Sequence, residues 1–560
     1  MGPRGPHRSP GDATRGLPAY SSHASRLRAG LGARLSLRPL QRRRAGGLLA
    51  SLVVVAALLL AHDAHHVAAA TRHDVRILVN QPATFDPAAA GDSGTAAITA
   101  QLYETLTTYD ASLTLQPALA ASWEVAADGR SVTFHLRPNL AFSDGTPLTA
   151  ADVVGSWLRI IDSRAPGPLA ALMIDVKGAR DHLAGRVTDP SAVGLRADGR
   201  DVIVDLERPG ADFPAIVSSP TFGIVPPSVW RDGGTNFGPG SVTSGGYTLS
   251  AVTTAELTLV RNEHYWAGPP AITTAHLVLD IGGRNPVTAF QAGDLDYTQV
   301  SVTDAPWIPY DRELGPALRS IPALTLTYLG LDTTKKPFDD PRVRQALGAA
   351  VDWRRIVPLG AFAGEVPADS MVPPGIPGGG AQDWLPAYDP NHARQLLAAA
   401  GYPDGAGLPV IRFASSGAPI GDAIAADLER ELHMHVERET FQDSLTRIST
   451  DPPNAWLTGW VADYVGPNDF LGVLLESGST NNYGKWSSPA FDQAIADALA
   501  TRDATATQAA YERALAIVKD QVPVVPLSGG TTFALSRQGL LGATDNGLGI
   551  LRIAGMAWAQ

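Results

Sequence analysis

The sequence predicts a mixed α/β protein, with strand-like and helix-like segments alternating from residue 74 onward. Short segments alternate apolar and polar residues at period two, and others carry apolar residues at helical spacing behind capping residues. The 56 glycines and 44 prolines are scattered along the chain, which indicates many turns. At 560 residues and 44% hydrophobic content, the chain is long enough for about three structural units with large cores.

The strand predictions rest on alternation. SVTFHLR (131–137) places Val132, Phe134 and Leu136 on one face, and DVIVDLE (201–207) repeats the pattern. We also expect strands at AELTLVRN (255–262) and ALTLTYLGLD (323–332).

The helix predictions rest on capping residues. Thr149 and Asp152 have the Thr-x-x-Asp spacing of a capping box, ahead of an apolar run at helical spacing. Asp340 precedes Pro341, a cap followed by proline at the first helical position, and Asp389-Pro390 repeats that arrangement. We expect a helix to begin at each of these three places.

Charge divides the chain into a basic leader and an acidic body. Residues 1–70 hold ten Arg and two Asp, a net charge of +8, which leaves −19 for the remainder of a chain of total charge −11. A body this acidic argues against a nucleic-acid partner, because neutralising phosphates requires a positive surface.

The leader contains an uncharged apolar run at 45–61, directly after Arg42-Arg43-Arg44. The run is long enough for a secretory signal core and reaches the lower limit for a membrane-spanning helix. Positive charge before it predicts that the body is exported. Two outcomes stay open: cleavage near Ala70, or tethering to the membrane by residues 45–61. The arginines leave both general and twin-arginine export open.

The sequence predicts no metal and no cofactor. His62, His65 and His66 of the leader are interpreted as a solvated linker rather than a metal site. His433 and His435 are interpreted as a solvated strand face. The chain has no cysteine, which excludes disulfides and a lipid-acceptor cysteine.

Familiar catalytic motifs are absent from the sequence. It has no Gly-x-Ser-x-Gly elbow, no His-Glu-x-x-His and no phosphate-binding loop, so we expect a protein that is not an enzyme. A hydrolase, including a glycosidase with paired carboxylates, stays open as a weaker alternative.

The stretch GWVADYVGPNDFL (459–471) raises three alternatives for Asp463: a catalytic acid, an anchor for a charged ligand, or the cap of a turn near Pro467. For capping, Asn468 and Asp469 are better placed. If 459–464 is a strand, Trp460 and Tyr464 share one face, and Asp463 points to the other face with Val461.

Several collinear stretches between residues 74 and 530 resemble the extracellular solute-binding proteins of bacterial ABC importers, in the oligopeptide/dipeptide-binding group (family 5). The stretches are LQPALAASWEVAADGRSVTFHLRPNLAFSDGTPLTAADVVGSWLRI (115–160), TSGGYTLSAVTTAELTLVRNEHYW (243–266), AFQAGDLDYTQV (289–300), KKPFDDPRVRQALGAAVDWRRIV (335–357), GWVADYVGPNDFL (459–471) and NNYGKWSSPAFDQAI (481–495).

The resemblance implies a two-lobed fold of the periplasmic-binding-protein type II kind, with an inserted domain and a ligand cleft between the lobes. One lobe would combine 71–107, 231–325 and 527–560, the insertion would be 108–230, and the second lobe would be 326–526. A few crossing strands between such lobes suit a hinge motion.

The resemblance also implies a site and partners. In peptide-binding relatives, the Asp of this Gly-Trp-x-Ala-Asp-Tyr stretch pairs with the α-ammonium of the peptide, which makes Asp463 the candidate anchor. The other candidate ligand-binding residues are Gly459, Trp460, Val461, Tyr464, Asn481, Asn482, Tyr483 and Arg447.

The expected ligand is a short peptide, delivered by a monomer to ABC permease subunits that work with a separate cytoplasmic ATPase. Leu457 stands where some tripeptide binders carry an arginine for the ligand carboxylate, and Arg447 is the candidate substitute. A sugar, a metal chelate, haem or an opine stays open as the ligand.

Overall fold

The computed structural model describes residues 72–560 apart from 302, 361–365, 369, 377–384, 416–418, 442–446, 449–450, 502 and 544. The described residues belong to one compact unit, Thr71–Gln560. The predicted apolar leader segment at 45–61 lies outside the described residues. Among the described residues, no helix combines the length and apolar character that a membrane crossing requires.

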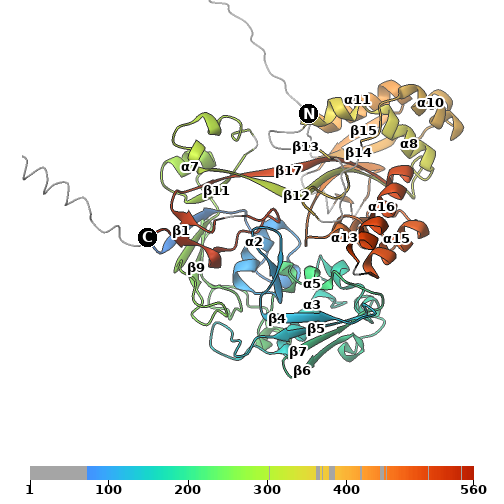
Figure 1. The fold of residues 1–560 in the computed structure, drawn as a ribbon. Helices are drawn as coiled ribbons and strands as arrows, with labels where there is room; N and C mark the ends of the chain where they lie inside the picture. Colours follow the sequence, from blue (N-terminus) through green and yellow to red (C-terminus); the bar gives the residue numbers. More distant parts are fainter. Residues whose placement is uncertain are drawn as a thin grey trace, which may run out of the picture. The chain divides into compact units, whose positions relative to one another are not determined.

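A large mixed sheet organises the described part of the chain (Figure 1). Strands β14, β15 and β16 pair in parallel, as do β1, β10 and β11, while the remaining pairs are antiparallel. The order across the sheet is β15 (Val436–Thr440), β14 (Ile411–Ser415), β16 (Ala455–Val461), β12 (Leu318–Leu331), β17 (Val524–Ser536), β11 (Tyr297–Val300), β1 (Asp74–Leu78), β10 (Thr274–Val278), β9 (Glu256–Arg261) and β8 (Tyr247–Val252), with β13 (Val366–Pro367) paired to β17.

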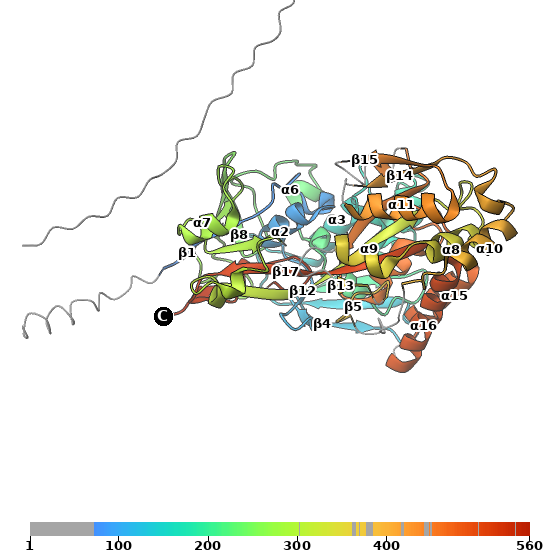
Figure 2. The ribbon, with the colours of Figure 1, turned by 90° about the horizontal axis from the view of Figure 1, so that it is seen from above.

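Two long strands, β12 and β17, connect the two ends of this sheet. They pair with each other along most of their length, β17 also pairs with β11, and β12 also pairs with β16. Figure 2 shows them running side by side from the region of α7 (Pro286–Gln291) toward α8 (Pro341–Ala350). The predicted lobe boundaries at 325/326 and 526/527 fall inside these two strands.

A separate antiparallel sheet lies in the region 108–230 (Figure 1). Its order is β4 (Ala120–Val125), β5 (Ser131–Leu136), β7 (Asp201–Asp205) and β6 (Leu195–Asp198). The alternating burial of β5 and β7 confirms the strands expected from their sequence alternation. The strands' inward residues pack on α3 (Ala150–Ile160) around the buried Trp157.

Helices cover both faces of the sheet near β12. Leu329 and Leu331 pack with one set of helices, while Leu326 and Tyr328, on the opposite face, pack with the other. The first set is α8, α9 (Trp353–Gly360), α10 (Pro390–Ala399) and α11 (Pro419–Leu432). The second is α13 (Pro467–Phe470), α14 (Gly472–Leu475), α15 (Pro489–Leu499) and α16 (Ala504–Gln521).

The remaining α-helices and β-strands lie outside the two sheets and the helix sets described above. They are α2 (Ser93–Leu102), β2 (Thr107–Tyr109), β3 (Leu115–Pro117), α4 (Ala179–Leu183), α5 (Phe213–Ile216), α6 (Pro227–Trp230), β18 (Leu540–Leu541) and β19 (Ala557–Trp558).

The predicted helix starts are confirmed. Thr149 and Asp152 form a reciprocal capping box at α3. Asp340 accepts a hydrogen bond from the N–H of Arg342 at α8, and Asp389 accepts one from the N–H of His392 at α10.

One local prediction is wrong. His433 and His435 do not share a strand face, because they lie in the turn between α11 and β15. His433 has a φ of 52°, in the left-handed region, so the chain reverses there and the strand begins only at Val436.

Candidate functional site

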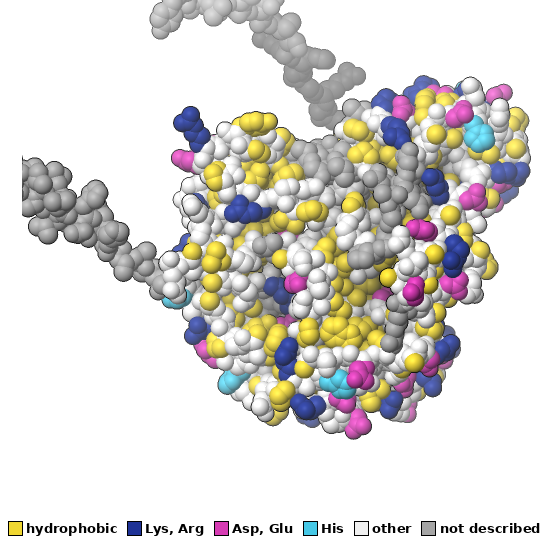
Figure 3. All heavy atoms as spheres, in the orientation of Figure 1, with side chains coloured by type: hydrophobic (Ala, Val, Ile, Leu, Met, Phe, Trp, Pro, Cys, Tyr) yellow, Lys and Arg dark blue, Asp and Glu magenta, His cyan; other side chains and the backbone are white. Residues whose placement is uncertain are grey.

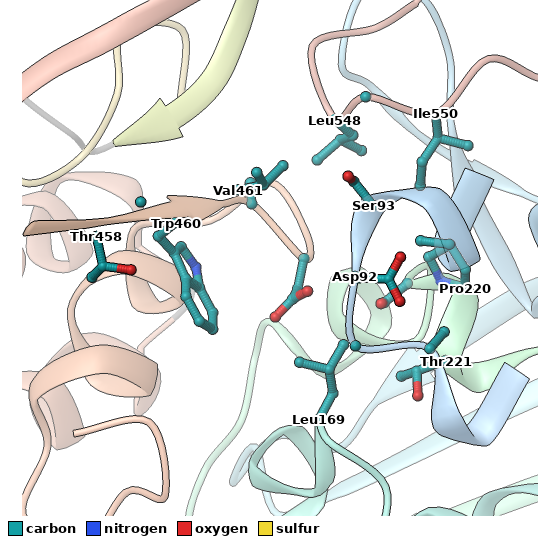
Figure 4. A pocket seen from close by; sticks show the side chains of 18 residues that line it. Asp92, Ser93, Leu169, Pro220, Thr221, Thr458, Trp460, Val461, Leu548 and Ile550 are labelled. Atoms are coloured by element: carbon teal, nitrogen blue, oxygen red, sulfur yellow. The ribbon is translucent and has the colours of Figure 1, made fainter. Parts of the chain in front are cut away.

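A cavity of about 300 Å³ lies where the end of β16 faces the first turn of α2. Figure 4 shows its two walls: Thr458, Trp460 and Val461 on one side, and residues from four other parts of the chain on the other. These are 90–93 with Ala96, Leu169, 219–221 and 548–550. Figure 3 shows a band of hydrophobic side chains across the lower middle of the face it draws, while most, though not all, charged side chains lie toward its edges.

The end of β16 has an unpaired edge. Within the described residues, its pairing with β14 stops at Trp456, while pairing with β12 continues to Val461. The N–H of Ala462 donates to the C=O of Leu324, and antiparallel pairs alternate, so the backbone groups of Gly459 and Val461 point away from β12. This edge can accept another extended backbone.

Asp463 lines the same cavity, just beyond this edge. Asp463 is partly buried. Its Oδ2 atom is shielded from solvent and has no hydrogen-bond partner in the described structure. A carboxylate oxygen that is neither hydrated nor paired is costly, so this atom favours an added hydrogen-bond donor.

Asp469 holds Asp463 in place. Its Oδ2 accepts the backbone N–H of Asp463 at 3.0 Å and the indole N–H of Trp460 at 3.1 Å. Within the described residues, α13 has no side-chain cap, so neither Asp463, Asn468 nor Asp469 performs the capping role considered from the sequence.

The two neighbouring carboxyl groups both have raised pKa values. Burial raises the pKa of Asp463 to about 7. Burial and the charge of Asp463 raise the pKa of Asp469 well above its usual value. Two buried carboxyl groups resist being ionised together, and a cation beside Asp463 would relieve this repulsion.

The faces expected for Asp463 and Tyr464 assumed a strand over 459–464, a condition that the structure does not meet. Thr458 and Trp460 lie on one side of the strand and Val461 on the other, as alternation requires (Figure 4). β16 ends at Val461, however, so strand parity does not continue to Asp463 and Tyr464. Trp460 and Asp463 therefore both line the cavity, while Tyr464 does not.

Tyr464 is fully buried against the core of the region 108–230. Its Oη donates to Asp212 Oδ2 at 3.0 Å, and Asn468 Nδ2 donates to the same oxygen at 3.3 Å. Arg208 forms ion pairs with Glu476 and with Asp175, the latter at 2.8 Å. These contacts fix the segment 464–476, and with it the Asp463 turn, against the region 108–230.

Asn481, Asn482 and Tyr483 line a different and much smaller space, beside Trp456. The amide of Asn482 is used by its own loop: it donates to the C=O groups of Leu475, Glu476 and Trp486 and accepts the N–H of Trp486. The structure does not bring these three residues to the cavity wall.

Arg447 also lies away from the cavity lining. Its guanidinium forms ion pairs with Glu439 and Asp451, the latter at 3.0 Å. Leu457 is buried in the apolar core beneath β16. Among the described residues that line the cavity, Asp92 and Asp463 carry charge and no Lys, Arg or His is present.

The second wall of the cavity was missed by sequence reasoning. Asp92 is recognisable as a cap, and it does accept the N–H of Thr95 at the start of α2. Nothing local in the sequence indicates that Leu169, Pro220 or Leu548 would face Trp460, because the fold brings these segments together from far apart.

Comparison with known proteins places this chain in a family. The family model "Bacterial extracellular solute-binding proteins, family 5 Middle" matches residues 114–482. The periplasmic oligopeptide-binding protein OppA of Salmonella typhimurium is 30% identical over 452 residues, 77% of this chain and 82% of OppA. The probable deoxycholate-binding periplasmic protein YgiS of Escherichia coli is 29% identical, over 80% of this chain and 86% of YgiS.

A solved structure shows the same fold. The Escherichia coli murein tripeptide binding protein MppA matches with a TM-score of 0.75 and 25% identity, covering 87% of this chain and 99% of MppA. This similarity confirms the predicted two-lobed α/β fold. By both the family model and these relatives, the chain belongs to the bacterial extracellular solute-binding proteins of family 5.

Proposed function

We propose that this protein is the substrate-binding component of an ABC importer and captures short peptides in the cavity beside β16. The ligand's backbone lies along the free edge at Gly459 and Val461, and its α-ammonium pairs with Asp463. One observation carries the proposal: a strand edge that is unpaired among the described residues ends beside a partly buried carboxylate, whose Oδ2 atom has no partner among them either.

Two relatives support the choice of peptides, since OppA is named for oligopeptides and MppA for a murein tripeptide. The lining supports it too, because Asp92 and Asp463 favour a cationic ligand end. Deoxycholate, an anion, is the ligand named for YgiS. The carboxylates of Asp92 and Asp463 make binding of such an anionic ligand unfavourable.

Capture would proceed by closure of the lobes around β12 and β17, followed by delivery to a membrane permease. ATP hydrolysis would come from a separate cytoplasmic subunit, and the binding protein would act as a monomer without catalysing a reaction. The leader would export the body and either be cleaved near Ala70 or tether it through residues 45–61.

Titration calorimetry with trialanine and N-acetyl-trialanine tests the proposal. Acetylation removes the α-ammonium and leaves the rest of the peptide unchanged. We expect trialanine to bind and the acetylated peptide to bind about 10-fold to 100-fold more weakly, the size of one charge-assisted hydrogen bond. Equal affinities would contradict the ammonium site, and no binding of either peptide would contradict peptide capture.

A further inference from the structure

A second cavity, of about 400 Å³, adjoins the first. The two cavities share Ser93, Val461 and Gly549 as lining residues, so they meet at the end of the free β16 edge. The second cavity extends from there toward β1, β11 and the start of β12.

Asp545 presents a carboxylate to this second cavity. The residue is only 3% exposed. Its Oδ1 accepts the N–H groups of Gly547 at 2.9 Å and Gly549 at 3.1 Å, which fixes the side chain. Both of these N–H groups bond Oδ1, and neither bonds Oδ2. Burial also raises the pKa of Asp545, as expected for a carboxylate without a cation.

Tyr297 provides an independent sign of a missing partner. It lines the same cavity and is 3% exposed, and its Oη is shielded from solvent without a hydrogen-bond partner in the described structure. Buried hydroxyl groups are normally paired, so this group also favours a ligand or water in the cavity.

The charged residues that line the two cavities are all acidic within the described residues. Asp92, Asp463 and Asp545 are the charged residues that line them, and no Lys, Arg or His does so within the described residues. Carboxylate and tyrosine oxygens both accept hydrogen bonds, and an ammonium or guanidinium group donates several at once.

We propose that the second cavity receives a cationic side chain of the bound peptide, with its ammonium or guanidinium group between Asp545 Oδ2 and Tyr297 Oη. The preferred ligands are then peptides with two cationic groups: the α-ammonium beside Asp463 and a Lys or Arg side chain in the second cavity. This inference rests on the proposed peptide-binding function. The shared residue Val461 provides the route, because a ligand backbone along the β16 edge lies beside both cavities.

The test is a lysine scan of trialanine by calorimetry with the full chain. Each of the three positions carries Lys in one peptide and norleucine, which has the same chain length without charge, in the matched peptide. We expect the Lys peptide to bind about 10-fold or more tightly than its norleucine match at one position.

Asp545→Asn should remove this preference and leave the affinity for trialanine unchanged, since Asn keeps the Oδ1 acceptor for the glycine N–H groups. Tyr297→Phe, which removes a hydroxyl that has no partner among the described residues, should reduce the preference without destabilising the fold.

The outcomes separate the two claims. Trialanine binding with equal Lys and norleucine affinities at every position would overturn the inference and leave the proposed function standing. A Lys preference that survives Asp545→Asn would also overturn it. Failure of every peptide to bind would overturn both.

Discussion

Asp463→Asn is the substitution that separates a ligand-binding role from a structural one. The side chain keeps its shape and loses its charge. In the empty protein, the wild-type Oδ2 atom is shielded and has no partner within the described residues, so removing the charge should leave the protein equally stable or more stable. In the complex, the same change removes the carboxylate that pairs with the α-ammonium.

The size of the affinity loss follows from the geometry. A hydrogen bond to a charged group contributes about 1.5–3 kcal/mol, and each 1.4 kcal/mol changes affinity tenfold. Asp463→Asn should therefore weaken trialanine binding roughly 10-fold to 150-fold. The backbone contacts at Gly459 and Val461 remain, so binding should weaken without disappearing.

The assay combines calorimetry with thermal unfolding, and Asp92→Asn is the matched control. Asp92 lines the same cavity, but it is exposed and already accepts the N–H of Thr95, a capping role that Asn retains. The control should change affinity by less than about threefold, as expected for an exposed charge.

Unchanged affinity in Asp463→Asn would refute the anchor role. Equal losses in both variants would mean that only the overall negative charge of the cavity matters. A lower melting temperature with unchanged affinity would show that Asp463 is structural.

Three further predictions concern pH, the strand edge and the lobe contact. Because the pKa of Asp463 is about 7 in the empty protein and a bound cation favours its ionised form, peptide affinity should fall as pH drops below about 7, by up to tenfold per pH unit in calorimetry; a flat profile from pH 5 to 8 would contradict this. The amides of Gly459 and Val461 should exchange hydrogen rapidly in the empty protein and slowly with peptide, while the Trp460 amide, paired with β12, should be protected in both states; unchanged exchange would argue against the edge. Glu476→Gln should lower the free energy of unfolding by about 1.5 kcal/mol, because it removes one of the two carboxylates that pair with Arg208 while Asp175 still pairs with the guanidinium; a change under about 0.5 kcal/mol in denaturant unfolding would show that the pair is not stabilising.

The parts of the fold that depend on residues close together in the sequence were predictable from it. The capping box of Thr149 and Asp152 and the cap at Asp340 lie within three residues of the groups they bond, so their spacing alone identifies them. The alternation in 131–137 likewise reports one buried face. The lobe arrangement came from resemblance, because strand order across a sheet depends on contacts between distant segments.

The candidate site was predictable only in part. Gly459, Trp460, Val461 and Asp463 line one cavity, as their shared segment suggested. The strand ends at Val461 while Asp469 holds the next turn, which no alternation pattern reveals.

The other candidate residues do not line the cavity, and two of them bond nearby groups of the protein instead. The Asn482 amide is used entirely by its own loop. Arg447 lies between two carboxylates, Glu439 and Asp451. Their residue types fit a peptide site, but whether a polar side chain meets the ligand depends on which nearby groups it bonds first.

Native mass spectrometry of the gently purified full chain, mixed with a pool of short peptides, tests the central claim most directly. We predict one intact peptide bound per chain, with a free amino terminus, and a smaller peptide-bound fraction in Asp463→Asn. A chain that retains no peptide from the pool, or one that returns shortened peptides, would contradict the assignment of this protein as a peptide-capturing solute-binding protein.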